Sequence, residues 1–297
     1  MLSNDREWAE RPDQGEKRGW TMGREWILRL AVLGCLLLPP SAVAAELPLW
    51  ELGLGVGVLQ MPEYRGSNER RSLVLPYPYL VYRGSLLRVD RERITSRIFG
   101  DRVLVDLSFS GGIPVKSDRN EARRGMPDLD PTFEVGPSLN IRLWEGDRRR
   151  FSVYLPLRAV FSTDFSSLRS RGWVANPRLV FEQGDLIPKS GLNLGISAGP
   201  LFADSSYHDY FYEVEPAYAT SARPAYGARS GYSGVALSLG LNKRFQKFTI
   251  NGFVSADFLK GSVIESSPLV KEKTSIMAGI TFSWVFKTSQ EMVSVER

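Results

Sequence analysis

Long runs in which apolar and polar residues alternate dominate the chain between residues 50 and 286. In residues 50–59 glycine fills most of one face, and the other face is apolar: Trp50, Leu52, Leu54, Val56 and Val58. Side chains at every second position of a β-strand point to the same side of its sheet. The pattern recurs at residues 101–110, 133–143, 151–161, 192–202, 235–242, 248–258 and 275–286. It predicts an all-β protein whose strands each have one apolar and one polar face.

Two architectures satisfy this pattern, a soluble β-sandwich and a transmembrane β-barrel that turns its apolar faces toward lipid. Most runs reach about 10 residues, which is enough to cross a bilayer when tilted, whereas soluble strands average roughly 5 or 6. Short connections also alternate with long ones, as in bacterial outer-membrane barrels. We further expect the aromatic residues near strand ends to lie at the membrane interfaces: Trp50, Tyr77, Tyr79, Tyr82, Trp144, Trp173, Trp284 and Phe286. The predicted fold is therefore an antiparallel transmembrane barrel.

The number of strands depends on one ambiguous segment, SLLRVDRERITSRIF at residues 85–99. If both termini lie in the periplasm, the strand number must be even. The segment then contributes two short strands or none. Twelve strands are the preferred prediction, and ten are the alternative.

The N-terminal region has the layout of a secretory signal peptide. An apolar stretch, WILRLAVLGCLLLPP at residues 26–40, follows basic residues and ends before the small residues SAVAA. Residues 1–45 are therefore predicted to be removed, with Met22 as the expected start. A lipoprotein acylated at Cys35 is disfavoured because apolar and small residues follow it. The expected mature chain has a barrel at residues 46–287, a periplasmic tail at residues 288–297, and no cysteine for disulfides, thiol chemistry or metal binding.

Charge gives limited information about partners. The formal net charge of +5 is small and both signs are interspersed, which argues against nucleic acid as a partner. Arginine-rich stretches at residues 88–97 and 148–150 are expected to be solvated or to face anionic headgroups. Outer-membrane lipid and lipopolysaccharide are therefore the first predicted partners.

The only histidine, His208, lies in a polar and aromatic segment at residues 203–227. A Ser–His or Asp–His pair there would suit a hydrolase, but Ser206 and His208 would point to opposite faces of an extended chain. We therefore expect no catalytic residue, no cofactor and no metal, and we expect the segment to fold over or into the barrel mouth. A short helix is expected within residues 214–222. Binding candidates in this segment are Asp204, Tyr207, Tyr210, Phe211 and Tyr226.

Three segments carry a resemblance to a known family. They are PEYRGSNERRSLVLPYPYLVYRG (62–84), GPLFADSSYHDYFYEVEPAYATSARPAYGARSGYSGVAL (199–237) and SSPLVKEKTSIMAGITFSWVF (266–286). With them the chain resembles the MipA/OmpV family of outer-membrane barrels over residues 48–286. It departs from the expected pattern at its end, because KTSQEMVSVER follows the aromatic residues that usually close such barrels.

The resemblance implies a Gram-negative outer-membrane protein without enzymatic activity. It also implies a scaffold that links a lytic transglycosylase to a murein-synthesising penicillin-binding protein. The alternatives are a small-solute channel with Arg142, Arg158, Arg178 and Glu182 in its lumen, and an outer-membrane hydrolase acting on lipid.

Overall fold

A computed structural model describes residues 45–84, 87–90, 93–99 and 103–295. The expected signal peptide with Cys35 therefore lies outside the described residues, except for Ala45. The described chain belongs to one compact unit, Ser41–Arg297. None of the helices in these ranges is long and apolar enough to cross a membrane.

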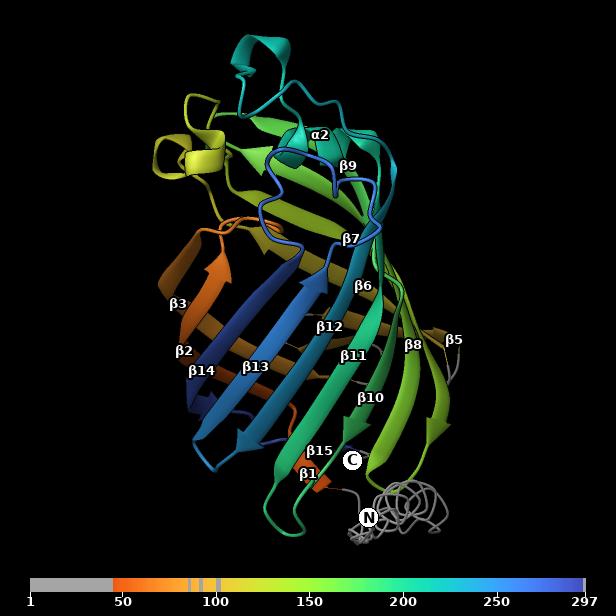
Figure 1. The fold of residues 1–297 in the computed structure, drawn as a ribbon. Coiled ribbons are helices and arrows are strands. Elements are labelled where there is room, and N and C mark those ends of the chain that lie inside the picture. The colour runs from red at the N-terminus through yellow and green to blue at the C-terminus, as the bar shows by residue number, and fades with distance from the viewer. Residues whose placement is uncertain (1–44, 85–86, 91–92, 100–102, 296–297) are drawn as a thin grey trace, which may run out of the picture. The chain divides into compact units, whose positions relative to one another are not determined.

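The strands of this unit form an antiparallel β-barrel (Figure 1). Along the chain they are β2 (Trp50–Pro62), β3 (Arg70–Arg83), β4 (Leu87–Asp90), β5 (Arg93–Phe99), β6 (Val103–Gly112), β7 (Thr132–Glu145), β8 (Arg149–Thr163), β9 (Leu168–Ala175), β10 (Arg178–Gln183), β11 (Leu192–Ala203), β12 (Gly231–Arg244), β13 (Phe248–Phe258) and β14 (Thr274–Thr288). Except for β9 and β10, sequential strands in this series pair with each other, and β14 pairs with β2. The predicted fold class is thus confirmed.

Strands β9 and β10 lie end to end in one path around the barrel. Both pair with β8 on one side and with β11 on the other. Asn176 and Pro177 separate them, and proline has no N–H to donate to a sheet ladder. The described part of the sheet therefore has twelve positions, two of which are the short strands β4 and β5. Because these two strands adjoin residues outside the described ranges, twelve transmembrane strands and periplasmic termini stay predictions.

The two faces of the strands separate as alternation requires. Trp284 is 52% exposed on the outer face, while its neighbour Ser283 is 0% exposed on the lumenal face. Large apolar side chains are exposed all along the outer face, for example Leu54, Val58, Leu155, Leu239, Val254 and Ile280. An exposed apolar band of this kind suits lipid contact. The predicted assignment of faces is correct for these strands.

Two of the aromatic residues expected at the membrane interface lie inside the barrel instead. Tyr79 is buried on the lumenal face of β3. The hydroxyl of Tyr77 lies 2.7 Å from Ser283 Oγ, and its ring covers Gly55, where an added Cβ would lie 2.3 Å from the ring. The prediction was wrong for these two residues because aromatic content alone does not distinguish odd from even positions of a strand.

Short connections join the strands at one end of the barrel, here called the turn end. Buried side chains from three neighbouring strands line the lumen at this end: Glu51, Tyr79, Val81 and Val285. Glu51 bridges Arg83 at 2.6 Å and Arg244 at 2.7 Å, so its buried carboxylate is paired with two cations. Nearby, β1 (Ala45–Pro48) pairs with β15 (Met292–Val295), which lies in the expected tail, in a separate two-stranded sheet.

Helices are few and short among the described residues, and all of them lie in the long connections. They are α2 (Ser205–Tyr212) and three 3₁₀ turns, η1 (Ser117–Arg119), η2 (Glu121–Arg123) and η3 (Pro216–Tyr218). The expected helix within residues 214–222 is reduced to η3, because Pro216 fits only a first turn. The principal helix, α2, precedes that segment and contains His208.

Candidate functional site: the loop cap

Four long connections pack together at the opposite end, here called the loop end, and form a structure that we call the loop cap. It comprises residues 63–69, 113–131, 204–230 and 259–273, which lie across the barrel mouth in Figure 1. Its buried core contains apolar side chains from all four connections: Tyr64, Val115, Ala122, Leu129, Tyr212, Val214, Leu259, Ile264 and Leu269. The predicted folding of residues 203–230 over the mouth is confirmed, and the other loops share in it.

The helix α2 begins because Asp204 caps it. The carboxylate Oδ1 of Asp204 accepts hydrogen bonds from the backbone N–H of Tyr207 at 3.0 Å and of Trp173 at 3.1 Å. Gly172 makes room for this carboxylate, since it has a φ of +94° and an added Cβ would lie 2.0 Å from Asp204 Oδ1. Asp204 therefore fixes α2 to strand β9.

The tyrosines of the 204–230 segment hold the cap together through their hydroxyl groups. Tyr212 donates to the carbonyl of Arg65 at 3.0 Å, Tyr210 to that of Asp130 at 3.2 Å, and Tyr226 to that of Val263 at 2.9 Å. Each bond crosses from one loop to another. Phe211 packs against the same core, and Tyr207 packs against lumenal residues of β8 and β9. The predicted binding residues are brought together, but as packing residues.

His208 is 0% exposed and is hydrogen-bonded through both ring nitrogens. Nδ1 lies 2.5 Å from the carbonyl oxygen of Arg229, and Nε2 lies 2.5 Å from Ser233 Oγ. A carbonyl only accepts, so Nδ1 carries the proton and Ser233 Oγ–H donates to Nε2. Burial lowers the pKa of His208, which keeps the ring neutral. The ring is thus in the tautomer that a serine nucleophile would need, but Ser233 is as buried as the histidine.

Beside this pair lies a half-buried ion pair between the first loop and the barrel wall. Arg65 Nε lies 3.2 Å from Asp257 Oδ1, and Arg65 Nη2 donates to the carbonyl of Ser233 at 3.1 Å. The guanidinium therefore connects residues 63–69 to β12 and β13 directly beneath α2. Sequence analysis missed Arg65, Ser233 and Asp257. In the sequence, only the position of Asp257 on the polar face of its strand indicated that it could form an ion pair inside the barrel.

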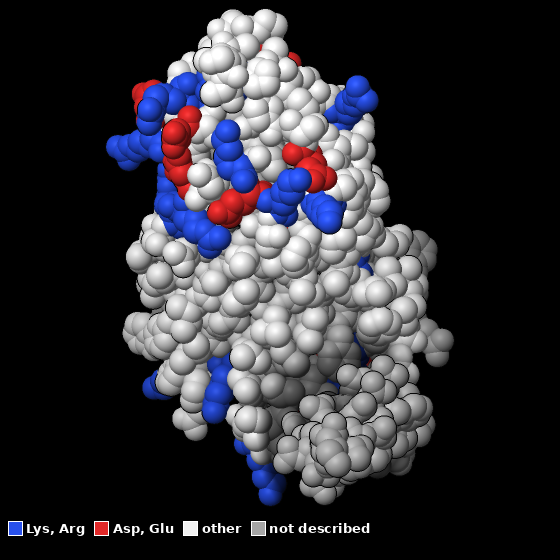
Figure 2. All heavy atoms as spheres, viewed as in Figure 1, with Lys and Arg blue, Asp and Glu red and all other residues white. Residues whose placement is uncertain are grey.

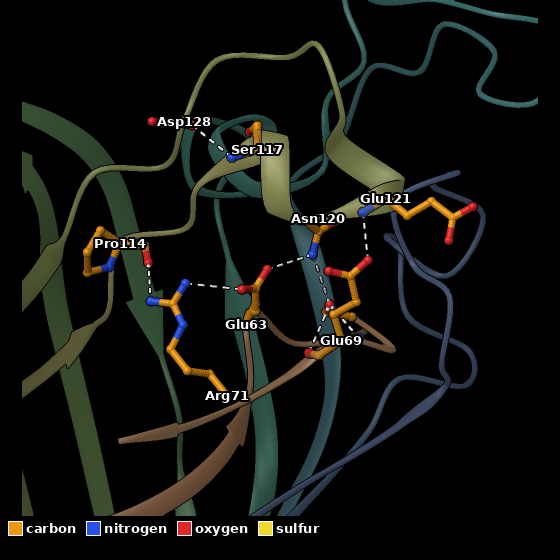
Figure 3. A network of polar contacts seen from close by, with 9 residues as sticks. Glu63, Glu69, Arg71, Pro114, Ser117, Asn120, Glu121 and Asp128 are labelled. Atoms are coloured by element: carbon orange, nitrogen blue, oxygen red, sulfur yellow. Dashed lines mark hydrogen bonds and ion pairs between the residues drawn. The ribbon is translucent and has the colours of Figure 1, made fainter. Parts of the chain in front are cut away.

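A second polar network joins the first loop to the second, as Figure 3 shows. The carboxylate of Glu63 accepts from Asn120 Nδ2 at 2.8 Å and pairs with Arg71 at 3.1 Å, while Arg71 also donates to the carbonyl of Pro114. Glu69 accepts from the backbone N–H of Glu121 at 2.6 Å. The network holds residues 113–131 over the barrel rim, so the carboxylates of Glu63 and Glu69 have a structural role.

The aspartates of the loop cap are held apart by separate contacts. Asp128 pairs with Lys116 and accepts from the N–H of Ser117, Asp204 caps α2, and Asp209 Oδ1 accepts from the N–H of Ala228. No group of three or more potential metal ligands occurs among the described residues.

The charged residues proposed for a channel lumen are satisfied by neighbouring side chains. Arg158 pairs with Glu134 at 2.8 Å, and Arg142 with Glu145 at 3.2 Å. Glu182 lies 3.5 Å from Arg150. Arg178 lies over the ring of Tyr154, with its guanidinium carbon 5.0 Å from the ring centroid.

The outer surface shows the expected charge layers on the face seen in Figure 2. Acidic and basic side chains are interspersed near the loop end. Below them lies a broad band without charged residues, followed by basic side chains toward the turn end. A charge-free band bounded by charged rims matches a membrane-spanning region.

Comparison with known proteins agrees with this architecture. A family model described as MltA-interacting protein MipA matches residues 54–286. A curated relative, outer membrane protein Omp26La from Vibrio anguillarum, is 25% identical over 216 residues, which cover 69% of this chain and 76% of the relative.

Solved structures with a similar fold include outer-membrane proteins of several kinds. An outer-membrane channel from Pseudomonas putida F1 is 14% identical and has a TM-score of 0.38, with 84% of this chain and 100% of that chain covered. The NanC porin is 7% identical with a TM-score of 0.35, covering 80% and 98%. The outer membrane protease OmpT from Escherichia coli is 7% identical with a TM-score of 0.27, covering 83% and 97%.

Proposed function

Since this chain belongs to the MipA family of outer-membrane proteins, we propose that it is a non-enzymatic barrel that acts as a scaffold or binding protein in the cell envelope. The observation that carries this proposal is the packing of the loop cap. Its tyrosines are used in contacts between loops, and both ring nitrogens of His208 are used in hydrogen bonds to Arg229 and Ser233. The proposed orientation places the loop end outside the cell and the turn end in the periplasm.

The enzyme alternative rests on the hydrogen bond between Ser233 and His208. A nucleophile must be reached by its substrate, and it needs a site for the substrate oxygen beside it. Both side chains are completely buried, and Arg65 already occupies the carbonyl of Ser233. If the barrel hydrolysed fluorescently labelled phospholipid, and Ser233→Ala removed the activity, the non-enzymatic proposal would be wrong.

The turn end is where murein enzymes would bind. The family description names an interaction with MltA, and we propose for this chain a lytic transglycosylase and a penicillin-binding protein as periplasmic partners. Three apolar side chains are exposed in the turns there: Leu186, Ile187 and Phe245. Residues 243–247, at the end of β12 and in the turn after it, add basic charge, and Lys243 lies over the ring of Phe245 at 5.2 Å. Such a mixed apolar and basic surface fits a protein partner as well as it fits headgroups.

Photo-crosslinking in whole cells tests this assignment. A photoreactive amino acid would replace Ile187 at the turn end, Ala225 in the loop cap, or Leu239 on the lipid face. We expect murein hydrolase or synthase peptides crosslinked to position 187, identified by mass spectrometry. Position 239 provides the matched control, because its crosslinks report lipid contact alone. Murein enzymes captured equally at 187 and 239, or at 225 only, would contradict a scaffold at the turn end.

Lipopolysaccharide is the proposed partner at the outer rim. Lys260, Lys271 and Lys273 are exposed in the connection that follows β13. Lysines at this height meet the anionic headgroups of the outer leaflet, where charge attraction contributes about 1 kcal/mol per residue near a membrane surface. Lys273 is already bonded to Glu265, so Lys260 and Lys271 are the residues of this connection left for lipid phosphates.

The channel alternative has weaker support from the structure. A conducting barrel needs a continuous lumen, and here the loop cap covers one end while the buried cluster of Tyr79, Val81 and Val285 narrows the lumen at the other. The ion pairs described above also neutralise the lumenal charges that would select solutes. Conductance in planar bilayers distinguishes a channel from a closed binding barrel.

A further inference from the structure

Between the two ends, the lumen has an open region lined by three neighbouring rows of residues. Antiparallel register places Gly195, Gly240, Phe253, Gly279, Leu59 and Leu73 in one cross-strand row that runs from β11 to β3. An added Cβ at Gly195 would meet no heavy atom within 4 Å, and one at Gly240 would meet only a backbone oxygen at 3.9 Å. The lumenal space in front of these two glycines is therefore open.

The wall beside this space is apolar. Leu59 and Phe253 lean together over Gly279, where an added Cβ would lie 2.5 Å from the leucine and 2.7 Å from the phenylalanine. In the next row toward the turn end, Leu75 is opposite Gly57 and remains 41% exposed although it is on the lumenal face. An exposed leucine on the lumenal face of a barrel is apolar surface that a ligand can cover.

Hydrogen-bonding groups border the apolar wall on both sides. Toward the turn end, an amide ladder runs around the lumen, with Asn193 donating to Asn242, Asn242 to Asn251, and Asn251 to Thr281. Toward the loop end, Ser238 and Ser255 lie 2.8 Å apart in the adjoining row. These three rows contain no charged side chain on β11 to β14.

One buried hydroxyl points independently to a ligand. Thr249 occupies the lumenal position next to Asn251 on β13, one step toward the turn end, and is 2% exposed. Its Oγ1 makes no hydrogen bond with any described residue. A buried hydroxyl without a partner costs about 1–3 kcal/mol, so a group that supplies the bond would be stabilised there.

From this arrangement we propose that the open region of the lumen binds a small uncharged molecule with an apolar ring and at least one hydroxyl. The ring packs against Phe253, Leu59 and Leu75, and the hydroxyl bonds to the amide ladder or to Thr249. An uncharged ligand fits because this wall carries no charge and because Arg158 and Glu134 on the facing strands are paired with each other. The site is independent of the proposed scaffold surface at the turn end.

The test uses 4-fluorophenol as the probe and the full barrel in lipid nanodiscs. Fluorine NMR measures saturable binding above that of empty nanodiscs. Gly240→Phe fills the open space, and Gly195→Leu fills it from the neighbouring strand. Gly252→Phe is the matched control, because Gly252 lies on the outer face of β13 and an added Cβ there meets nothing closer than a backbone oxygen at 4.0 Å.

We expect saturable binding by the unmodified barrel, at least tenfold weaker binding by each lumenal variant, and unchanged binding by Gly252→Phe. Heat-modifiable gel mobility shows which variants have folded, and either lumenal variant alone suffices for the comparison. If no saturable binding exceeds that of empty nanodiscs, or if a folded lumenal variant binds like the control, the proposal is overturned.

Discussion

At the scale of single residues, His208 connects the stability of the loop cap to pH. Burial lowers the pKa of His208 in the folded cap, and Arg65 adds to this, while Asp204 and Asp209 oppose it. A base whose pKa is depressed on folding stabilises the fold fully above its unfolded pKa of about 6.5, and this contribution is lost as pH falls through the lower folded pKa.

We therefore expect the cap to open more often as pH falls below about 6.5. Hydrogen exchange of α2, measured between pH 7.5 and pH 5 and corrected for intrinsic rates, reports this opening. In His208→Gln the same comparison should show a clearly smaller pH dependence, since the amide does not titrate. An equal pH dependence in both proteins would show that groups other than His208 control the cap.

Tyr212 provides the residue-scale test of cap packing. Its ring is buried in the cap core and its hydroxyl bonds to the first loop. Tyr212→Phe removes only that hydrogen bond and should cost about 1 kcal/mol. Tyr212→Ala also removes the ring and should cost about 3–5 kcal/mol of local stability. Limited proteolysis within residues 204–230 measures local opening in both variants. If Tyr212→Ala were cleaved no faster than Tyr212→Phe, the ring would not be part of a packed core.

At the scale of strands, alternation makes a direct prediction for β14. Ile280 is exposed on the lipid face, while Thr281 is on the lumenal face and accepts from Asn251. An arginine on the lipid face near the bilayer midplane costs about 2–4 kcal/mol, so Ile280→Arg should lower the unfolding free energy in lipid by that amount. Thr281→Arg reaches water in the lumen and should cost less. Urea titration in liposomes gives the unfolding free energy of both variants. If Thr281→Arg cost more than Ile280→Arg, the lipid and lumenal faces of β14 would be assigned the wrong way round.

The strands were predictable from sequence because a strand with one apolar face follows a single local rule, the alternation of apolar and polar residues. Every second residue of β8 or β14 faces lipid, so the identity of the side chain reveals its side. The rule does not extend to aromatic residues, since Tyr77 and Tyr79 are lumenal where packing at the turn end needs bulk. Alternation also does not reveal how close two strands lie in space when they are far apart in the chain.

The helix α2 and the His208–Ser233 pair were not predictable for a different reason. The sequence SSYHDYFY consists of residues with modest helix propensity, and a helix of 8 residues is not stable by itself. It forms because Asp204 caps it and because the other loops bury its tyrosines. Ser233 is 25 residues from His208 in sequence and meets it only because the connection returns to β12.

At the scale of the whole molecule, the loop cap covers one end of the barrel, and buried side chains narrow the lumen at the other. The loop cap has a core of four connections, and Glu51, Tyr79, Val81 and Val285 line the narrowed end. A binding barrel tolerates this arrangement, whereas a channel does not. We therefore expect no steady ion conductance when the purified barrel is placed in planar bilayers.

The two closures also predict how conductance would arise. Replacing residues 206–228 by a short linker opens the loop end but leaves the turn end narrowed, so conductance should stay low. Tyr77→Ala with Tyr79→Ala opens the lumen beside Gly55 but leaves the cap. Only the combination should give a steady open state, because the two closures are in series. Steady conductance by the unmodified barrel would overturn the scaffold proposal in favour of a channel, and conductance after cap removal alone would show that the turn end is not closed.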